Sequence, residues 1–226
     1  MRQHLFIDAD DTLWENNVYF EDAFDRFVDF LDHSSMTPVQ IRAALDEIEI
    51  VNAQIHGYGS LNFGRNLQQC YQHLAQRDIH EGDLARVMSF AEQILDSPME
   101  LIDGVETTLA SLAERHVLVL CTKGNPDEQK MKIDRSGLAR YFVHTRIVKE
   151  KHSAVYGSLT AELDCDLDRT WMIGNSPKSD INPALAAGLG AVFIPHERTW
   201  GLEKEHVLPS PRLLVIDRFS DLTRHF

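Results

Sequence analysis

The stretch Phe6-Ile7-Asp8-Ala9-Asp10-Asp11-Thr12-Leu13 decides the fold, because it changes from apolar to acidic residues within a few positions. The run Leu5-Phe6-Ile7 predicts a short buried strand that ends at the first aspartate. While the chain stays extended, residues two apart point the same way, so Asp8 and Asp10 place two carboxylates together. Such carboxylates repel each other unless a cation or a shared proton lies between them. A hard divalent ion, Mg²⁺ above all, suits these oxygen ligands.

The sequence after this strand shows two different patterns, one up to residue 97 and another from residue 98 onward. Residues 15–97 carry apolar residues at three- and four-residue spacing, as in Phe20, Phe24 and Phe27, which predicts about four amphipathic helices. After residue 98, apolar strand-like runs at 117–121, 142–148, 171–173 and 191–194 alternate with helical segments, which predicts a parallel sheet covered on both faces. We therefore expect an α/β fold: a Rossmann-like core of residues 1–14 and 98–226, with an inserted all-helical domain of residues 15–97.

Composition narrows the possible partners. The 226 residues include 22 Lys+Arg and 35 Asp+Glu, a net charge of −13, which argues against nucleic acid and anionic membranes as partners. No apolar run is long enough to span a membrane, and the first residues lack a secretory signal pattern, so we expect a cytoplasmic protein. The three cysteines are far apart and odd in number, which predicts neither a disulfide framework nor a zinc site.

Polar residues follow four of the predicted strands. They are Asp8 and Asp10 after the first strand, Thr122 after the second, Lys149 and Lys151 after the third, and the segment Gly174-Asn175-Ser176-Pro177-Lys178-Ser179-Asp180 after the fourth. In an open parallel sheet, ligands bind beyond the carboxyl ends of the strands. We therefore expect these groups to converge, although each alone is a weak signal.

In this order and spacing the segments resemble the haloacid dehalogenase-like (HAD) hydrolase superfamily. The first matches its motif I, Asp-x-Asp-x-Thr-Leu. Thr122 matches motif II, a lysine near position 150 matches motif III, and Gly174 to Asp180 resembles motif IV. The resemblance covers essentially the whole chain. The helical block matches the cap that the family inserts after motif I, at the C1 position.

The resemblance implies a role for each matched residue. Asp8 is the nucleophile that forms an aspartyl-phosphate, and Asp10 is the general acid and then the base. Thr122 and the backbone N–H groups of the turn at Lys123 and Gly124 hold phosphoryl oxygens. A motif III lysine neutralises the transition state, and Lys151 is favoured over Lys149 because it directly precedes a predicted helix.

The metal site implied by the resemblance departs from the family pattern at one position. Mg²⁺ is held by Asp8, by the backbone carbonyl of Asp10 and by Asp180. Asn175 stands where the family often has aspartate, so one ligand oxygen remains but a charge is lost. Either the metal binds more weakly or it relies on Asp180.

The function implied is hydrolysis of a small phosphorylated metabolite by a Mg²⁺-dependent phosphatase. The alternatives are a phosphomutase or dehalogenase of the same fold, or a catalytically degenerate HAD domain that acts as a binding module. The helical block holds 5 arginines, no lysine and 14 acidic residues, which favours a substrate with a single phosphate. Arg65 is the candidate substrate contact in this block. Whether the protein is a monomer or a homodimer stays open.

Overall fold

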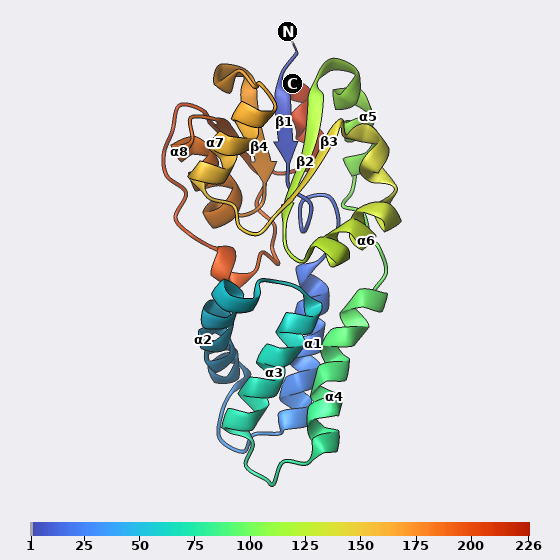
Figure 1. Ribbon diagram of the computed structural model, residues 1–226, viewed down its shortest axis with the longest axis vertical. Helices are drawn as coiled ribbons and strands as arrows, with labels where there is room; N and C mark the ends of the chain where they lie inside the picture. The colour runs from blue at the N-terminus through green and yellow to red at the C-terminus, as the bar shows by residue number, and fades with distance from the viewer. Residues whose placement is uncertain (1) are drawn as a thin grey trace. The chain divides into compact units, whose positions relative to one another are not determined.

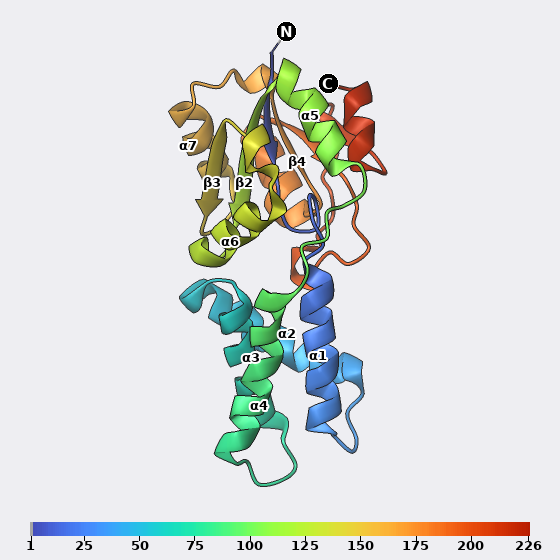
Figure 2. The same ribbon diagram turned by 90° about the vertical axis from the view of Figure 1, so that its right-hand side faces the viewer.

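A computed structural model describes residues 2–226, which divide into two compact units. One unit joins the residues up to Asn16 to Met99–Phe226 and contains the sheet; the other, Asn17–Pro98, is helical. We call them the sheet unit and the helical unit. Figures 1 and 2 show both units.

The sheet unit contains six parallel strands. They are β1 (His4–Ile7), β2 (Val117–Lys123), β3 (His144–Val148), β4 (Thr170–Gly174), β5 (Gly190–Phe193) and β6 (Leu213–Val215). Their order in the sheet is β3-β2-β1-β4-β5-β6, so the direction of winding reverses between β1 and β4. In such doubly wound sheets the ligand crevice lies at this reversal, beyond the carboxyl ends of the strands. The parallel α/β architecture expected from the sequence is confirmed.

Both faces of the sheet are buried, because alternate residues of each central strand point to opposite sides. Leu5 and Ile7 pack with helices α5 (Val105–Arg115) and α6 (Pro126–Ser136), whereas Phe6 packs with α7 (Ser153–Glu162) and α8 (Asn182–Ala186). Figure 1 shows these two pairs of helices on either side of the strands. Because helices cover both faces of the sheet, its strands contain continuous apolar runs such as Leu5-Phe6-Ile7.

Three details differ from the sequence expectations. The edge strand β6 was not predicted, since three residues give too short an apolar run to stand out. The third strand begins at His144 rather than Phe142. Motif IV continues into a π-helical turn, Pro177–Ile181, so the helical segment expected after the fourth strand is only the short α8. The other short helical turns are Gln93–Asp96, Leu138–Tyr141, Leu167–Arg169, Gly201–Glu203 and Phe219–Arg224.

The helical unit consists of α1 (Asn17–Leu31), α2 (Pro38–His56), α3 (Ser60–Leu74) and α4 (Glu81–Glu92). Their apolar sides enclose one core that includes Phe24, Phe27, Leu45, Leu67 and Val87. The local sequence sets helix ends here: Thr37 caps α2 in a capping box with Gln40, and Pro38 occupies the first helical turn. Among the helices described in residues 2–226, none has the length and apolar character needed to cross a membrane.

Candidate active site

A buried lysine joins two carboxylates from different strand ends. The Nζ of Lys151 lies 2.5 Å from Oδ1 of Asp8 and 2.7 Å from Oδ1 of Asp180. Asp8 continues β1, where its N–H donates to the Ile173 carbonyl, and Asp180 lies in the π-helical turn after β4. The sequence prediction that these three residues converge is therefore met by their geometry. Lys149, the alternative motif III lysine, is exposed.

The charges in this cluster do not balance. Burial and the neighbouring Asp8 carboxylate raise the pKa of Asp180, Lys151 opposes both, and the result is a pKa of about 7. For Lys151, burial lowers the pKa, but the charges of Asp180 and Asp8 outweigh it and raise the pKa above its ordinary value. One ammonium thus faces two carboxylates in a site where the Lys151 and Asp180 side chains are each 1% exposed. Such a site favours a further cation.

Asp10 has a separate set of partners. Its carboxylate accepts hydrogen bonds from the Trp14 indole at 2.7 Å, from Gln129 at 2.8 Å and from Lys132 Nζ at 2.6 Å to each oxygen. Burial raises its pKa, but the Lys132 charge and these hydrogen bonds outweigh burial and lower the pKa below its ordinary value. The carboxylates of Asp8 and Asp10 therefore have different lysine partners, Lys151 for Asp8 and Lys132 for Asp10.

The residues that hold Asp10 were not identified from the sequence. Gln129 and Lys132 lie three positions apart on α6, so they share one face of that helix. The sequence feature that could have pointed to them is their place on the helix directly after the motif II turn. Lys132 also donates to Asn16 Oδ1 at 3.0 Å, which ties α6 to the segment after motif I.

Thr122 lies buried at the end of β2 and donates to Gln129 Oε1 at 3.3 Å. The Gly124 N–H, which the sequence suggested as a phosphate donor, instead donates to the Val148 carbonyl at 3.2 Å. The Lys123 ammonium also has a partner within the protein, the Glu203 carboxylate. Gly124 has φ +143°, and a Cβ there would meet Gln129 Nε2 at 2.9 Å, so glycine is required by both its conformation and its neighbours.

The motif IV loop is held by residues from three segments. Asn175 donates through Nδ2 to Thr199 Oγ1 at 3.0 Å, and its Oδ1 accepts from Thr12 Oγ1 at 3.3 Å. The Thr12 hydroxyl also donates to Asp8 Oδ2 at 3.1 Å, which links Asn175 to Asp8. At Gly174 a Cβ would meet Asp180 Oδ2 at 2.2 Å, so only glycine leaves room for that carboxylate.

Glu203, which the sequence did not point to, connects motif II to motif IV. Its Oε1 lies 2.6 Å from Lys123 Nζ, and its Oε2 accepts from Ser176 at 2.6 Å and from Ser179 at 2.5 Å. Burial raises the pKa of Glu203, but Lys123 and the serine hydroxyls outweigh burial and lower it. This ion pair fixes the turn that carries Asp180.

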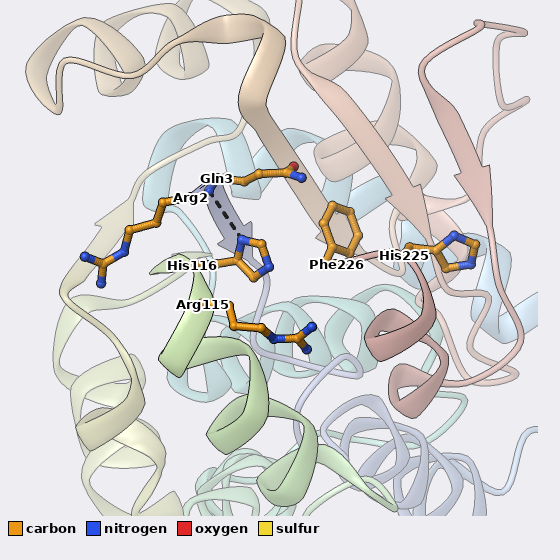
Figure 3. Close-up of a pocket in the computed structure, with 6 residues that line it drawn as sticks. All are labelled: Arg2, Gln3, Arg115, His116, His225 and Phe226. Carbon is orange, nitrogen blue, oxygen red and sulfur yellow. Dashed lines mark hydrogen bonds between the residues drawn. The ribbon is translucent and has the colours of Figure 1, made fainter.

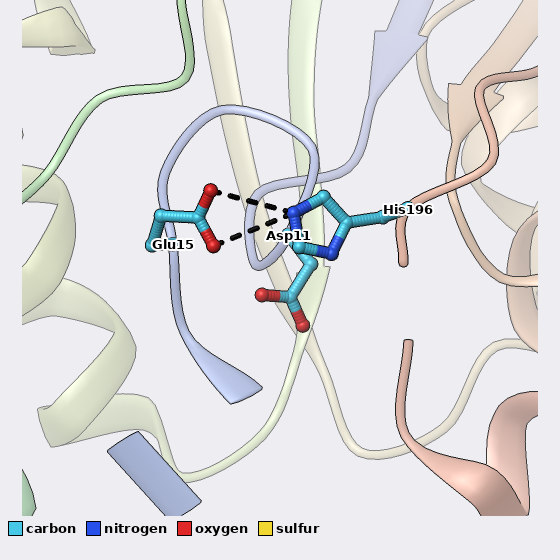
Figure 4. Close-up of side chains that lie close together, drawn as sticks. All are labelled: Asp11, Glu15 and His196. Atoms are coloured by element: carbon cyan, nitrogen blue, oxygen red, sulfur yellow. Dashed lines mark hydrogen bonds and ion pairs between the residues drawn. The ribbon is translucent and has the colours of Figure 1, made fainter. Parts of the chain in front are cut away.

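A second cluster lies on the loop after motif I. Asp11, Glu15 and His196 bring one ligand atom each to within 4.8 Å of the others (Figure 4). The His196 Nε2 is 3.4 Å from the Glu15 carboxylate, and Asp11 accepts the Asn16 N–H at 2.9 Å despite its left-handed φ of 57°. The three residues are thus already paired within the protein and hold this loop.

Arg65 lies in the helical unit, where it donates to Asn62 Oδ1 at 2.7 Å, and its substrate role stays a prediction.

The fold and this geometry define a class: an α/β protein in which buried aspartates and a lysine lie at the carboxyl ends of a doubly wound sheet. The family model for haloacid dehalogenase-like hydrolases matches residues 3–188. The chain therefore belongs to the haloacid dehalogenase-like hydrolase family.

Solved structures agree with this assignment. A haloacid dehalogenase-like family hydrolase from Xanthomonas campestris is 30% identical with a TM-score of 0.87, and the match covers 99% of this chain and 90% of that one. A 2-haloacid dehalogenase from Pseudomonas syringae is 21% identical (TM-score 0.64, 99% and 97% covered). A predicted phosphoglycolate phosphatase from Haemophilus somnus is 15% identical (TM-score 0.69, 99% and 97% covered). The last two show the fold alone. No curated protein matches the sequence.

Proposed function

We propose that this chain is a Mg²⁺-dependent phosphomonoester hydrolase that acts on a small phosphorylated metabolite through an aspartyl-phosphate. The observation that carries the proposal is the buried Asp8–Lys151–Asp180 cluster at the carboxyl end of the central strand, with Asp10 following two residues later. A second aspartate at this place supports phosphatase chemistry, because it offers an acid and base beside the nucleophile.

The residues present fit Mg²⁺. The Asp8 and Asp180 carboxylates, the Asp10 backbone carbonyl and the Asn175 side-chain oxygen form an all-oxygen donor set, the kind that Mg²⁺ prefers. Two buried carboxylates facing one ammonium also leave a negative charge for a cation to balance. We propose these four residues as the ligand set. When bound, the ion screens the charge of the incoming phosphoryl group.

The protein's own residues account for the remaining steps. An oxygen of Asp8 attacks phosphorus, the bond to the leaving oxygen breaks, and Asp10 protonates that oxygen. Asp10 then takes a proton from water, the water oxygen attacks phosphorus, and the bond from phosphorus to Asp8 breaks to release phosphate and free the carboxylate. Lys151 neutralises charge on the phosphoryl group in both steps, and the Thr122 hydroxyl binds a phosphoryl oxygen.

The contacts of Asp10 suit this cycle. Lys132, Gln129 and Trp14 hold its carboxylate in the ionised form, which is the form that accepts a proton from water. A phosphate dianion that enters beside it favours the protonated form, since like charges raise the pKa of a carboxyl. Substrate binding thus supplies the condition for the acid step.

Carbon–halogen hydrolysis is the second candidate, because one matched structure is a 2-haloacid dehalogenase. That branch of the family needs no metal. The dehalogenase branch generally lacks the second aspartate of motif I, so Asp10 favours the phosphatase.

We also propose that the helical unit is the cap that selects the leaving group, with Arg65 as a substrate contact. In that role Arg65→Ala raises KM for the native substrate and leaves a generic aryl phosphate unaffected. Equal effects on both substrates would remove Arg65 from the specificity role.

The experiment that separates the candidates measures phosphate release from a panel of phosphomonoesters and halide release from 2-haloacids in parallel. Wild type, Asp8→Asn and the exposed-site control Asp217→Asn are compared, each with Mg²⁺ and with a chelator. We expect phosphate release in wild type and the control only with Mg²⁺, and none in Asp8→Asn. Halide release without metal would establish the dehalogenase instead, and no release of either product would favour a binding module.

A further inference from the structure

We propose that the sheet unit has a second site, for a small oxyanion, at the amino ends of β1 and β2. These strand ends are opposite to the end where Asp8 lies, since Asp8 follows the carboxyl end of β1. A cavity of about 450 Å³ is lined there by Arg2, Gln3, Arg115, His116, His225 and Phe226. Because one water takes about 30 Å³, the cavity has room for a small anion and several waters.

Two residues that line this cavity each have a buried polar atom without a hydrogen-bond partner among residues 2–226. These atoms are the His116 Nε2 and the Gln3 Oε1. His116 is 6% exposed, and its Nδ1 accepts the Gln3 backbone N–H at 3.3 Å. A neutral imidazole that accepts at Nδ1 carries its proton at Nε2, so a buried donor is left without an acceptor. A buried donor without an acceptor destabilises the protein, and a bound ligand that accepts this hydrogen bond removes that loss.

The charges around His116 favour an anion as that ligand. Burial lowers its pKa first, and the charges of Arg115 and Arg2 lower it further. Within residues 2–226, no acidic side chain forms an ion pair with Arg2, Arg115 or His225, although the protein carries 13 more acidic than basic groups. The Arg115 guanidinium donates to the carbonyl and hydroxyl oxygens of Ser111.

The close-up view shows how these groups are arranged. In Figure 3 the His116 ring lies between the Gln3 side chain and the Arg115 guanidinium, with the Phe226 ring beyond it. The same view shows the charged ends of Arg2 and His225 directed away from His116, so His116, Arg115 and Gln3 are the groups on which the site depends. An oxyanion accepts from His116 Nε2–H and from Arg115, and one that keeps a proton also donates to Gln3 Oε1. Hydrogen phosphate meets all three requirements, so inorganic phosphate is the probe.

The test follows the ring N–H signal of His116 by NMR in protein labelled with ¹⁵N-histidine, assigned with His116→Gln. Inorganic phosphate is titrated in at constant ionic strength, and the same titration is run on Arg115→Gln and on the matched control Arg218→Gln, an exposed arginine of the same unit. A charge-assisted hydrogen bond of about 1.4 kcal/mol corresponds to a tenfold change in affinity. We therefore expect a saturable shift whose dissociation constant rises about tenfold in Arg115→Gln and stays unchanged in Arg218→Gln.

The site is separable from the proposed active site in the same experiment. In Asp8→Asn the His116 signal is expected to respond to phosphate as in wild type. The absence of a saturable shift at His116, equal weakening in both arginine variants, or the same response to sodium chloride would each overturn the proposal.

Discussion

The ion pair between Glu203 and Lys123 leads to the sharpest prediction for stability. Lys123 has two acidic partners: Glu203 at 2.6 Å, whose side chain is 10% exposed, and Glu150 at 3.2 Å, whose side chain is 45% exposed. Breaking a buried pair typically costs about 3–5 kcal/mol, whereas an exposed pair contributes about 0–1 kcal/mol. We therefore expect Glu203→Gln to lower the free energy of unfolding by about 3 kcal/mol and Glu150→Gln by less than about 1 kcal/mol.

The tryptophans make the assay selective. Trp14, Trp171 and Trp200 all belong to the sheet unit, so their fluorescence during urea unfolding reports on that unit.

The Glu203 pKa is depressed below its ordinary value of 4.5, so the contribution of Glu203 to the free energy of unfolding is present above that pH and is lost as the pH falls through the folded-state pKa. The difference between wild type and Glu203→Gln should shrink accordingly in acid. Equal losses in the two variants at neutral pH, or a difference that grows in acid, would refute the reasoning.

Three further predictions test other parts of the structure. Gly174→Ala places a Cβ 2.2 Å from Asp180 Oδ2, so we expect this variant to lose hydrolysis. In the control Gly157→Ala, on α7, the added Cβ meets nothing within 4 Å, and the variant should raise the unfolding free energy by about 0.5–1 kcal/mol. Rate assays and urea titrations of both variants check these two expectations. Lys132→Met removes the ammonium from Asp10 and should lower kcat/KM on an aryl phosphate about ten- to a hundredfold, with unchanged circular dichroism, while retention of the wild-type rate would exclude Lys132 as a positioning residue. Burial raises the pKa of Cys70 and Cys121 to about 12, so at pH 8 about one thiol in ten thousand is ionised, and iodoacetamide mapping of native protein should find both unmodified.

The sequence was informative wherever a local pattern determines structure. The apolar runs predicted β1, β2, β4 and β5, because a strand buried on both faces needs consecutive apolar residues. The same reasoning placed Asp8, Lys151 and Asp180 at neighbouring strand ends, and the hydrogen bonds between them agree. Local patterns with strong physical causes thus predicted the frame of the site.

Other parts of the site depend on contacts that no local pattern encodes. Glu203 reaches Lys123 from 80 residues away, and it lies in a short turn with no periodicity of its own. The Asp10 carboxylate was expected to lie with that of Asp8, but it is bonded to Gln129 and Lys132 of α6, whose approach depends on the packing of the sheet unit. The Gly124 N–H was expected to be free for phosphate, yet the pairing of β2 with β3 continues to that residue. Such contacts follow only from the tertiary structure.

The central claim is that Asp8 attacks phosphorus in a reaction that needs Mg²⁺. The most direct measurement is the rate of phosphate release from a generic aryl phosphate as Mg²⁺ is titrated into metal-free protein, with wild type and Asp8→Asn side by side. We predict no activity without the ion, saturable activation of wild type, and no activity of Asp8→Asn at any Mg²⁺ concentration. Activity that survives chelation, or that persists undiminished in Asp8→Asn, would contradict the claim.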